Sequence, residues 1–217
     1  MAEAERVQSH PARDTGAVVV MFSVLAATNG VLSLFDPAQM NPQHPAIQET
    51  AFGVVIGWVT GFSLAFARRR WEPATIFVRA IYTWGCAMCV LHIVVAFHLA
   101  HGWSHEVAWE HTREVGGYGN GIFVNYAFAL VWFADVVWAW VAFDSYLSRP
   151  RWITWAVYGF TGFVVFNASV VFNTGFTRAV CALLFIALAR ITWNDWRTRG
   201  YSQQEANAED RGGSEAQ

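Results

Sequence analysis

Five of the seven histidines lie between residues 91 and 111, at the end of a strongly apolar segment, in the run LHIVVAFHLAHGWSHEVAWEH. On one continuous α-helix, at about 100° per residue, His98, His101 and His105 fall within roughly 60° of one another. Ionisable side chains at membrane depth are costly, so they need a partner or a task. The spacing therefore predicts a metal site or a proton-handling site on one helix face.

Neutral imidazoles combined with carboxylates are typical ligands of zinc, copper(II) and non-haem iron. A row at positions i, i+3 and i+7 offers two adjacent imidazoles to one ion, so a third ligand must come from elsewhere. The side chains that could supply it are His44, His111, Glu106 and Glu110. The alternative without a functional site is that each histidine lies in the membrane interface and forms hydrogen bonds to water.

The sequence argues against a haem site, an H-E-x-x-H zinc site and a cysteine redox or metal site. The remaining predicted membrane segments contain no histidine, so a bis-histidine haem would need His44 from a loop or a second subunit. His105 and Glu106 begin an H-E-x-x-H pattern, but Trp109 occupies its last position. Cys86 and Cys89 have the spacing of a redox or metal pair, yet they lie inside an apolar helix, where packing is the better interpretation.

Other polar residues recur at one depth of the predicted membrane segments. Counting inward at about 1.5 Å per residue, Asn29, His98, Asn125 and Asn167 all lie within roughly 10 Å of the same boundary. The three asparagines either link helices through hydrogen bonds or act as ligands. Asp135 lies deeper, and it is either a proton carrier or the partner of a buried hydroxyl or thiol.

The composition indicates an integral membrane protein. Of 217 residues, 55% are hydrophobic and 14% are charged, against about 25% charged residues in a soluble domain. Hydropathy predicts an all-α bundle of about six transmembrane helices, each near the ~20 residues that a bilayer requires. The predicted spans are 16–35, 51–67, 80–101, 121–143, 152–172 and 179–193.

The predicted spans form one domain, residues 16–196, between two polar ends. The leader 1–15 and the tail 197–217 are expected to be disordered. Residues 36–50 contain three prolines and are expected to form a loop, and the first apolar stretch is expected to remain as a span because no basic signal sequence precedes it.

Arginines predict the orientation. They cluster at residues 68–79, 149–151 and 190–199, whereas the opposite loops carry only Arg113 and Arg178. The positive-inside rule then places both termini in the cytoplasm of a protein in the cell membrane, with the histidines on the outer side. The formal net charge of −2 argues against a nucleic-acid partner. The expected partners are the lipid bilayer and, in addition, a second copy or another membrane protein.

Three functions are compatible with these patterns. The first is a metal-binding membrane protein with redox or Lewis-acid chemistry. The second is a small proton-coupled transporter in which His98, His101 and Asp135 relay protons, and the third is a structural or assembly subunit without chemistry.

Overall fold

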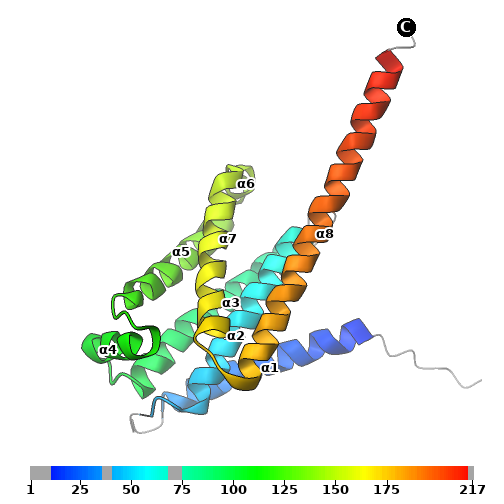
Figure 1. Cartoon of the computed structure of the whole chain (residues 1–217). Helices are drawn as coiled ribbons and strands as arrows, with labels where there is room; N and C mark the ends of the chain where they lie inside the picture. The colour runs from blue at the N-terminus through cyan, green and yellow to red at the C-terminus, as the bar shows by residue number, and fades with distance from the viewer. Residues whose placement is uncertain (1–10, 36–40, 68–74, 215–217) are drawn as a thin grey trace, which may run out of the picture.

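The computed structural model describes residues 11–35, 41–67 and 75–214, and every regular element in these ranges is helical. Figure 1 shows a bundle with α4 at one end and α6 at the opposite end. We refer to these as the α4 end and the α6 end. The elements are α1 (Pro11–Ser33), α2 (Pro45–Ala67), α3 (Thr75–Leu99), α4 (His105–Gly116), α5 (Gly121–Val141), α6 (Phe143–Ser148), α7 (Arg151–Phe166), the π-helical segment η3 (Asn167–Val171) and α8 (Gly175–Ser214).

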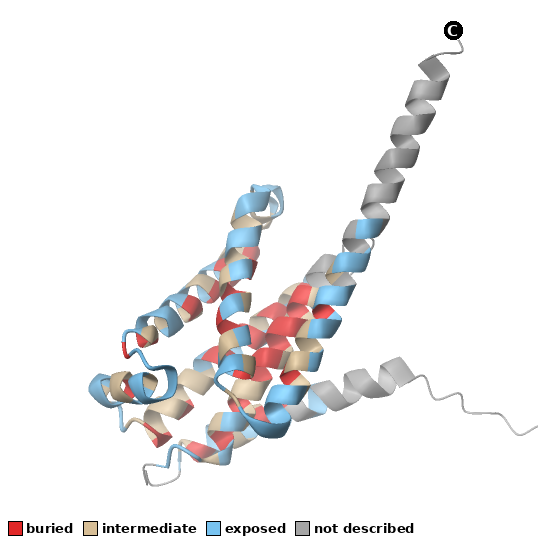
Figure 2. Ribbon diagram, in the orientation of Figure 1, coloured by how far each residue is buried: buried red, intermediate tan, exposed pale blue. Residues whose placement is uncertain are grey.

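Four helical stretches are long and apolar enough to cross a membrane. They are Ile76–Leu99, Gly121–Val141, Arg151–Val171 and Gly175–Asn194. Large apolar side chains on their outer faces are exposed, among them Leu130, Phe163 and Leu183, whereas buried residues gather where the helices meet (Figure 2). An apolar exterior of this kind is compatible with a protein embedded in lipid.

The prediction of six spans is not confirmed. The four stretches match the last four predicted spans, but α1 and α2 are not among them. In α1, the apolar stretch found among the described side chains is the shorter Ser23–Ser33. The predicted loop 36–50 is also too long, because α2 begins at Pro45. Proline is tolerated in the first turn of a helix, where its missing N–H has no partner to lose.

Glycines bring α2 and α3 into close contact. Gly53, Gly57 and Gly61 recur every four residues on α2, and a Cβ added to Gly57 would overlap the backbone of Gly85 on α3. Small residues at this spacing let two helix backbones approach. The two helices therefore form the closely packed centre against which α1, α5, α7 and α8 lie.

Two buried polar contacts tie α7 to the rest of the bundle. Trp58 of α2 donates its indole N–H to the hydroxyl of Thr161 on α7 over 2.9 Å, and both side chains are buried. At the α6 end, the carboxylate of Asp135 on α5 pairs with the guanidinium of Arg149. Arg149 is separated from the start of α7 by a single residue, Pro150. The hydroxyl of Tyr146 also donates to Asp135. Asp135 is thus the partner of a buried hydroxyl, as one of the two sequence interpretations had it, and also of a cation, which the sequence did not suggest.

The C-terminal tail differs from the expectation. Residues 197–214 continue α8 as a helix up to Ser214, where disorder was expected. The run from Gln203 to Asp210 contains alanine, glutamate and glutamine, which are good helix formers and extend a helix that the membrane segment has already started. At the other end α1 begins at Pro11, and residues 1–10 of the predicted leader lie outside the described residues.

A histidine pair at the end of an apolar cavity

The chain reverses direction in the middle of the histidine run. α3 ends at Leu99, and both Gly102 (φ 53°) and Trp103 (φ 61°) adopt left-handed backbone conformations. A helix cannot continue through such residues. The prediction of one continuous helical stripe containing His98, His101 and His105 is therefore wrong, because the three residues belong to α3, the turn and α4 respectively.

α4 is a separate helix with defined ends. The Ser104 hydroxyl accepts a hydrogen bond from the N–H of Val107 at its start, and Gly117 (φ 74°) ends it. On its inner side, the Trp109 indole N–H donates to the side-chain carbonyl of Asn120 over 3.0 Å, and the ring packs directly over Gly119. Serine as N-cap and glycine after the last turn are the signals by which the sequence could have predicted this helix.

Most of the proposed metal ligands are separated and engaged elsewhere. His98 accepts a hydrogen bond from the Trp103 indole N–H over 3.3 Å, and His105 shares one of 2.9 Å with the hydroxyl of Tyr126. His44 accepts from the N–H of Ala46 at the start of α2. Within residues 11–35, 41–67 and 75–214, no group of three His, Cys, Asp or Glu side chains could hold a metal ion.

The two glutamates of the predicted ligand set lie on α4. Glu106 is exposed in its first turn. Glu110 forms an ion pair with Arg113, one turn further along the helix, at 2.5 Å. This hydrogen bond to the guanidinium lowers the pKa of Glu110. Glu106 is exposed and Glu110 pairs within its own helix, so neither glutamate joins the other predicted ligands in a group of three.

His101 and His111 are the two predicted ligands that the fold brings together. Their ring centres are 5.4 Å apart. His101 is partly buried, and its Nδ1 atom is buried without a hydrogen-bond partner among the described residues. Burial, and to a lesser degree the nearby His111, lower the pKa of His101. At neutral pH its imidazole is therefore held in the uncharged form, which can accept a hydrogen bond or bind a metal ion.

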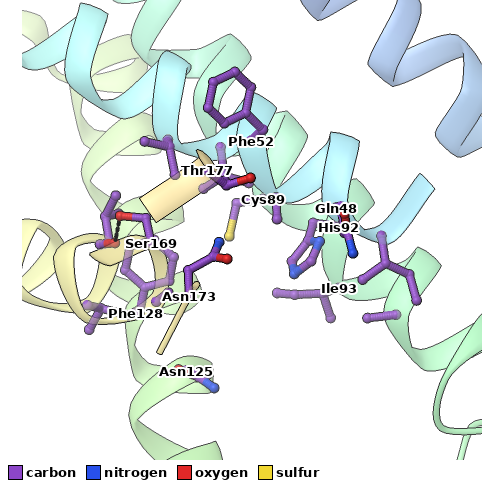
Figure 3. A pocket seen from close by; sticks show the side chains of 18 of the residues that line it. Gln48, Phe52, Cys89, His92, Ile93, Asn125, Phe128, Ser169, Asn173 and Thr177 are labelled. Atoms are coloured by element: carbon purple, nitrogen blue, oxygen red, sulfur yellow. Dashed lines mark hydrogen bonds between the residues drawn. The ribbon is translucent and has the colours of Figure 1, made fainter. Parts of the chain in front are cut away.

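Both rings line a cavity of 770 Å³ that extends from α4 into the bundle. Its walls are mainly apolar and include Phe52, Val55, Ile93, Phe128, Val165 and Val180. Figure 3 shows side chains from α2, α3, α5, η3 and the start of α8 around this space. The volume falls within the ~300–1,000 Å³ range of small-molecule binding sites.

Polar groups in the cavity come from several elements. His92 of α3 shares a hydrogen bond of 3.1 Å with the Thr50 hydroxyl, which itself donates to the Ala46 carbonyl over 2.6 Å. The hydroxyl proton is thereby used, so the His92 Nδ1–H is the donor and its other nitrogen is left as an acceptor. Asn125, Ser169 and Asn173 also line the space (Figure 3).

The predicted layer of asparagines is divided by the fold. Asn125 lines the cavity, whereas the amide of Asn29 donates to the Glu49 carboxylate on α2 over 2.6 Å. Asn167 donates to the Phe163 carbonyl of its own helix and begins η3. Asn29 thus links two helices, which is one of the two roles that the sequence left open. The Asn167 bond stays within its own helix and links none, while Asn125 is available to a bound molecule.

Sequence reasoning missed a group of cavity-lining residues. Among them are Gln48, Glu49, Cys89, His92, Asn173, Thr177 and Cys181. Gln48 and Glu49 lie in the region that was predicted to be a loop up to Thr50, and the two thiols belong to helices in which they were interpreted as packing residues. The missing signal is tertiary, since no pattern within one helix tells which of its faces borders a cavity.

The cavity carries little charge. Among its lining residues in the described part of the chain, Glu49 is the one side chain that is formally charged at neutral pH, and no lysine or arginine lines it. Comparison of the chain with models of protein families, with curated proteins and with solved structures finds no match. What the site can do follows from its geometry: it offers apolar walls, imidazoles, amides and hydroxyls.

Proposed function

We propose that this protein is a multi-pass membrane protein that binds an uncharged, single-chain amphiphile, with its apolar part inside the bundle and its head group at the histidines. The observation that carries the proposal is the 770 Å³ cavity, whose apolar walls lead to His101 and His111. Apolar contacts supply most of the affinity in such sites, and a few polar groups fix the orientation of the ligand.

The head group that fits is a hydroxyl or another neutral hydrogen-bond donor. His101 presents a buried ring nitrogen without a partner, and a donor on the ligand would satisfy it. A carboxylate or phosphate would be placed near Glu49 with no cationic side chain on the cavity wall. Burying a second negative charge there is unfavourable, because like charges repel strongly in a medium of low dielectric constant.

The η3 segment supports a binding role independently of the histidines. Ala168 and Ser169 of η3 line the cavity, and the Ser169 hydroxyl donates to the Val165 carbonyl over 2.6 Å. π-helical turns within α-helices are uncommon and are frequently found at functional sites. The irregular turn therefore lies where a ligand would contact α7.

A photoreactive long-chain alcohol carrying a diazirine tests this proposal with protein in lipid nanodiscs. Labelling is expected to saturate and to map to cavity-lining peptides of α2, α3 and η3. The Ala168→Phe variant fills the cavity and is expected to reduce this labelling at least about five-fold, because overpacking costs roughly 1 kcal/mol or more. The matched control is Ala127→Phe, at an exposed position of α5 that does not line the cavity.

The corresponding long-chain carboxylic acid, with the same diazirine, serves as the second probe. It is expected to label the cavity less than the alcohol does. Labelling that does not saturate, maps to lipid-facing residues such as Leu130, and is equal in both variants would show that the cavity holds no such ligand. Stronger labelling by the acid would contradict the assignment of an uncharged head group.

The proton-relay alternative receives less support from the geometry. Asp135 does not line the cavity, and it is paired with Arg149 at the α6 end. A relay through His98, His101 and Asp135 would have to cross from one end of the bundle to the other. A purely structural subunit remains the outcome if neither an amphiphile nor a metal ion binds.

We also propose that the α4 end faces the outside of the cell membrane and that both termini are cytoplasmic. Arg149 and Arg151 lie at the junction of α6 and α7, and Arg79 donates to the Ala139 carbonyl near the end of α5 that leads to α6. Arg113 lies on α4, and Arg178 lies in the first turn of α8, which starts toward the α4 end in Figure 1. Trp103→Cys and Ser148→Cys variants, at exposed positions of opposite ends, test this in intact cells. A membrane-impermeant maleimide should label the first and not the second, and the reverse pattern would invert the topology.

A further inference from the structure

The histidine pair has a geometry of its own, separate from the cavity that it borders. His101 lies in the turn after α3, and His111 lies on α4, which folds back beside the turn. Neither ring takes part in the hydrogen bonds that engage His98 and His105. The pair is therefore formed by two imidazoles from different elements, with ring centres 5.4 Å apart.

This separation matches two imidazoles bound to one ion. A ring nitrogen lies about 1.1 Å from its ring centre, and a metal–nitrogen bond of ~2.1 Å then puts each ring centre about 3.2 Å from the ion. At a tetrahedral angle the two ring centres are then about 5.2 Å apart. The observed 5.4 Å differs from this value by little more than the variation of such bonds.

The structure also leaves a nitrogen for which a metal ion would be a partner. The Nδ1 atom of His101 is buried and has no hydrogen-bond partner in the described part of the chain. A buried polar group without a partner keeps the cost of its lost hydration. Coordination of an ion or hydrogen bonding to a ligand would remove this cost.

We propose that His101 and His111 together bind a zinc(II) or copper(II) ion at the α4 end of the cavity, with its other coordination positions open to water or to a bound head group. Zinc and copper(II) accept imidazole ligands. Non-haem iron fits less well, because its usual site needs a carboxylate beside two histidines, and no such group of three is found among the described residues. This site goes beyond amphiphile binding, since the ion needs only the two imidazoles and water.

Copper(II) is the probe of choice, because it binds nitrogen ligands most tightly among the divalent ions of the first row and has an electron paramagnetic resonance spectrum. The full chain, purified without a histidine tag and held in nanodiscs without added alcohol, is titrated with Cu²⁺. One ion per chain is expected, with the spectrum of two imidazole nitrogens. His101→Ala or His111→Ala is expected to remove one nitrogen from the Cu²⁺ spectrum and to weaken Cu²⁺ binding by about 100-fold. This corresponds to the part of the binding free energy that one ligand contributes in a zinc site.

His105→Ala is the matched control, because this residue comes from the same histidine run and its Nδ1 atom shares a hydrogen bond with Tyr126. This variant is expected to keep the affinity and the two-nitrogen spectrum. His111 is exposed, so its replacement leaves the folded core intact, and circular dichroism verifies this. An unchanged spectrum in the double variant His101→Ala, His111→Ala would overturn the proposal.

The two proposals fail in different measurements. If Cu²⁺ binds with two nitrogens but the alcohol does not label the cavity, the metal site stands and amphiphile binding is wrong. If the alcohol labels the cavity while Cu²⁺ binds equally to all variants, the histidine pair is only the polar end of an organic binding site. The Ala168→Phe variant, which fills the cavity, is expected to leave the Cu²⁺ spectrum unchanged.

Discussion

The ion pair between Asp135 and Arg149 allows a quantitative test of how the bundle is held at the α6 end. Both side chains are almost fully removed from solvent, with exposed fractions of 2% and 4%. Arg149 also donates from Nε to the Thr154 hydroxyl over 3.0 Å. Exposed ion pairs contribute little to stability because water and salt screen them, but this pair is shielded from solvent. Replacing Arg149 by methionine would leave a buried, unpaired carboxylate, and we expect a loss of about 3–5 kcal/mol in unfolding free energy.

The double variant Asp135→Leu, Arg149→Met distinguishes a charge effect from a general loss of packing. It removes both charges, and we expect it to be more stable than Arg149→Met alone, because apolar replacement of a buried pair is often neutral. Arg151→Met, at an exposed position two residues away, should change stability by less than about 0.5 kcal/mol. Equilibrium unfolding in mixed micelles, followed by circular dichroism, measures all three. Our reasoning would be refuted if Arg149→Met unfolded like Arg151→Met.

Two further predictions concern the packing of α2. Gly57→Val should lower the unfolding free energy by about 1–3 kcal/mol, because the side chain would force the backbone of Gly85 away. The control Gly159→Ala, where the added methyl group would lie in open space, should be neutral or should stabilise by up to about 1 kcal/mol. Equal losses in the two variants would contradict the close contact between α2 and α3. Trp58→Phe should cost about 1 kcal/mol through loss of the hydrogen bond to Thr161, and no change in thermal unfolding would show that this bond contributes nothing.

The apolar segments were the most predictable part of the fold. The spans predicted at 80–101, 121–143, 152–172 and 179–193 each overlap one of the four stretches found in the structure. Length and apolarity are properties of a single segment, so they can be judged without knowing its neighbours. The second predicted span fared less well, because α2 contains Gln48 and Glu49 in its first turns and begins before its apolar part. For the first, the apolar stretch found among the described residues of α1 is the shorter Ser23–Ser33.

The candidate site was only partly predictable. His101 was predicted as part of a helical stripe and His111 as a possible third ligand from outside it, but the stripe assumed one helix through Gly102 and Trp103. The left-handed backbone at these two residues separates α3 from α4. Gly102, two residues before a serine that can cap a helix, was a visible sign of this break. The approach of His111 to His101, in contrast, depends on how α4 folds back, and no local pattern encodes that direction.

The five-residue π turn has a consequence for any chain that shares this architecture. A π turn holds one more residue than an α turn, so side chains beyond Asn167 are rotated by about 100° relative to an uninterrupted helix. A homologue that lacks the additional residue and forms an uninterrupted helix would therefore keep the same side chains beyond this point directed toward the ligand space. Gain or loss of a single codon here would thus change the cavity wall at the π turn itself and leave the facing of the later residues intact.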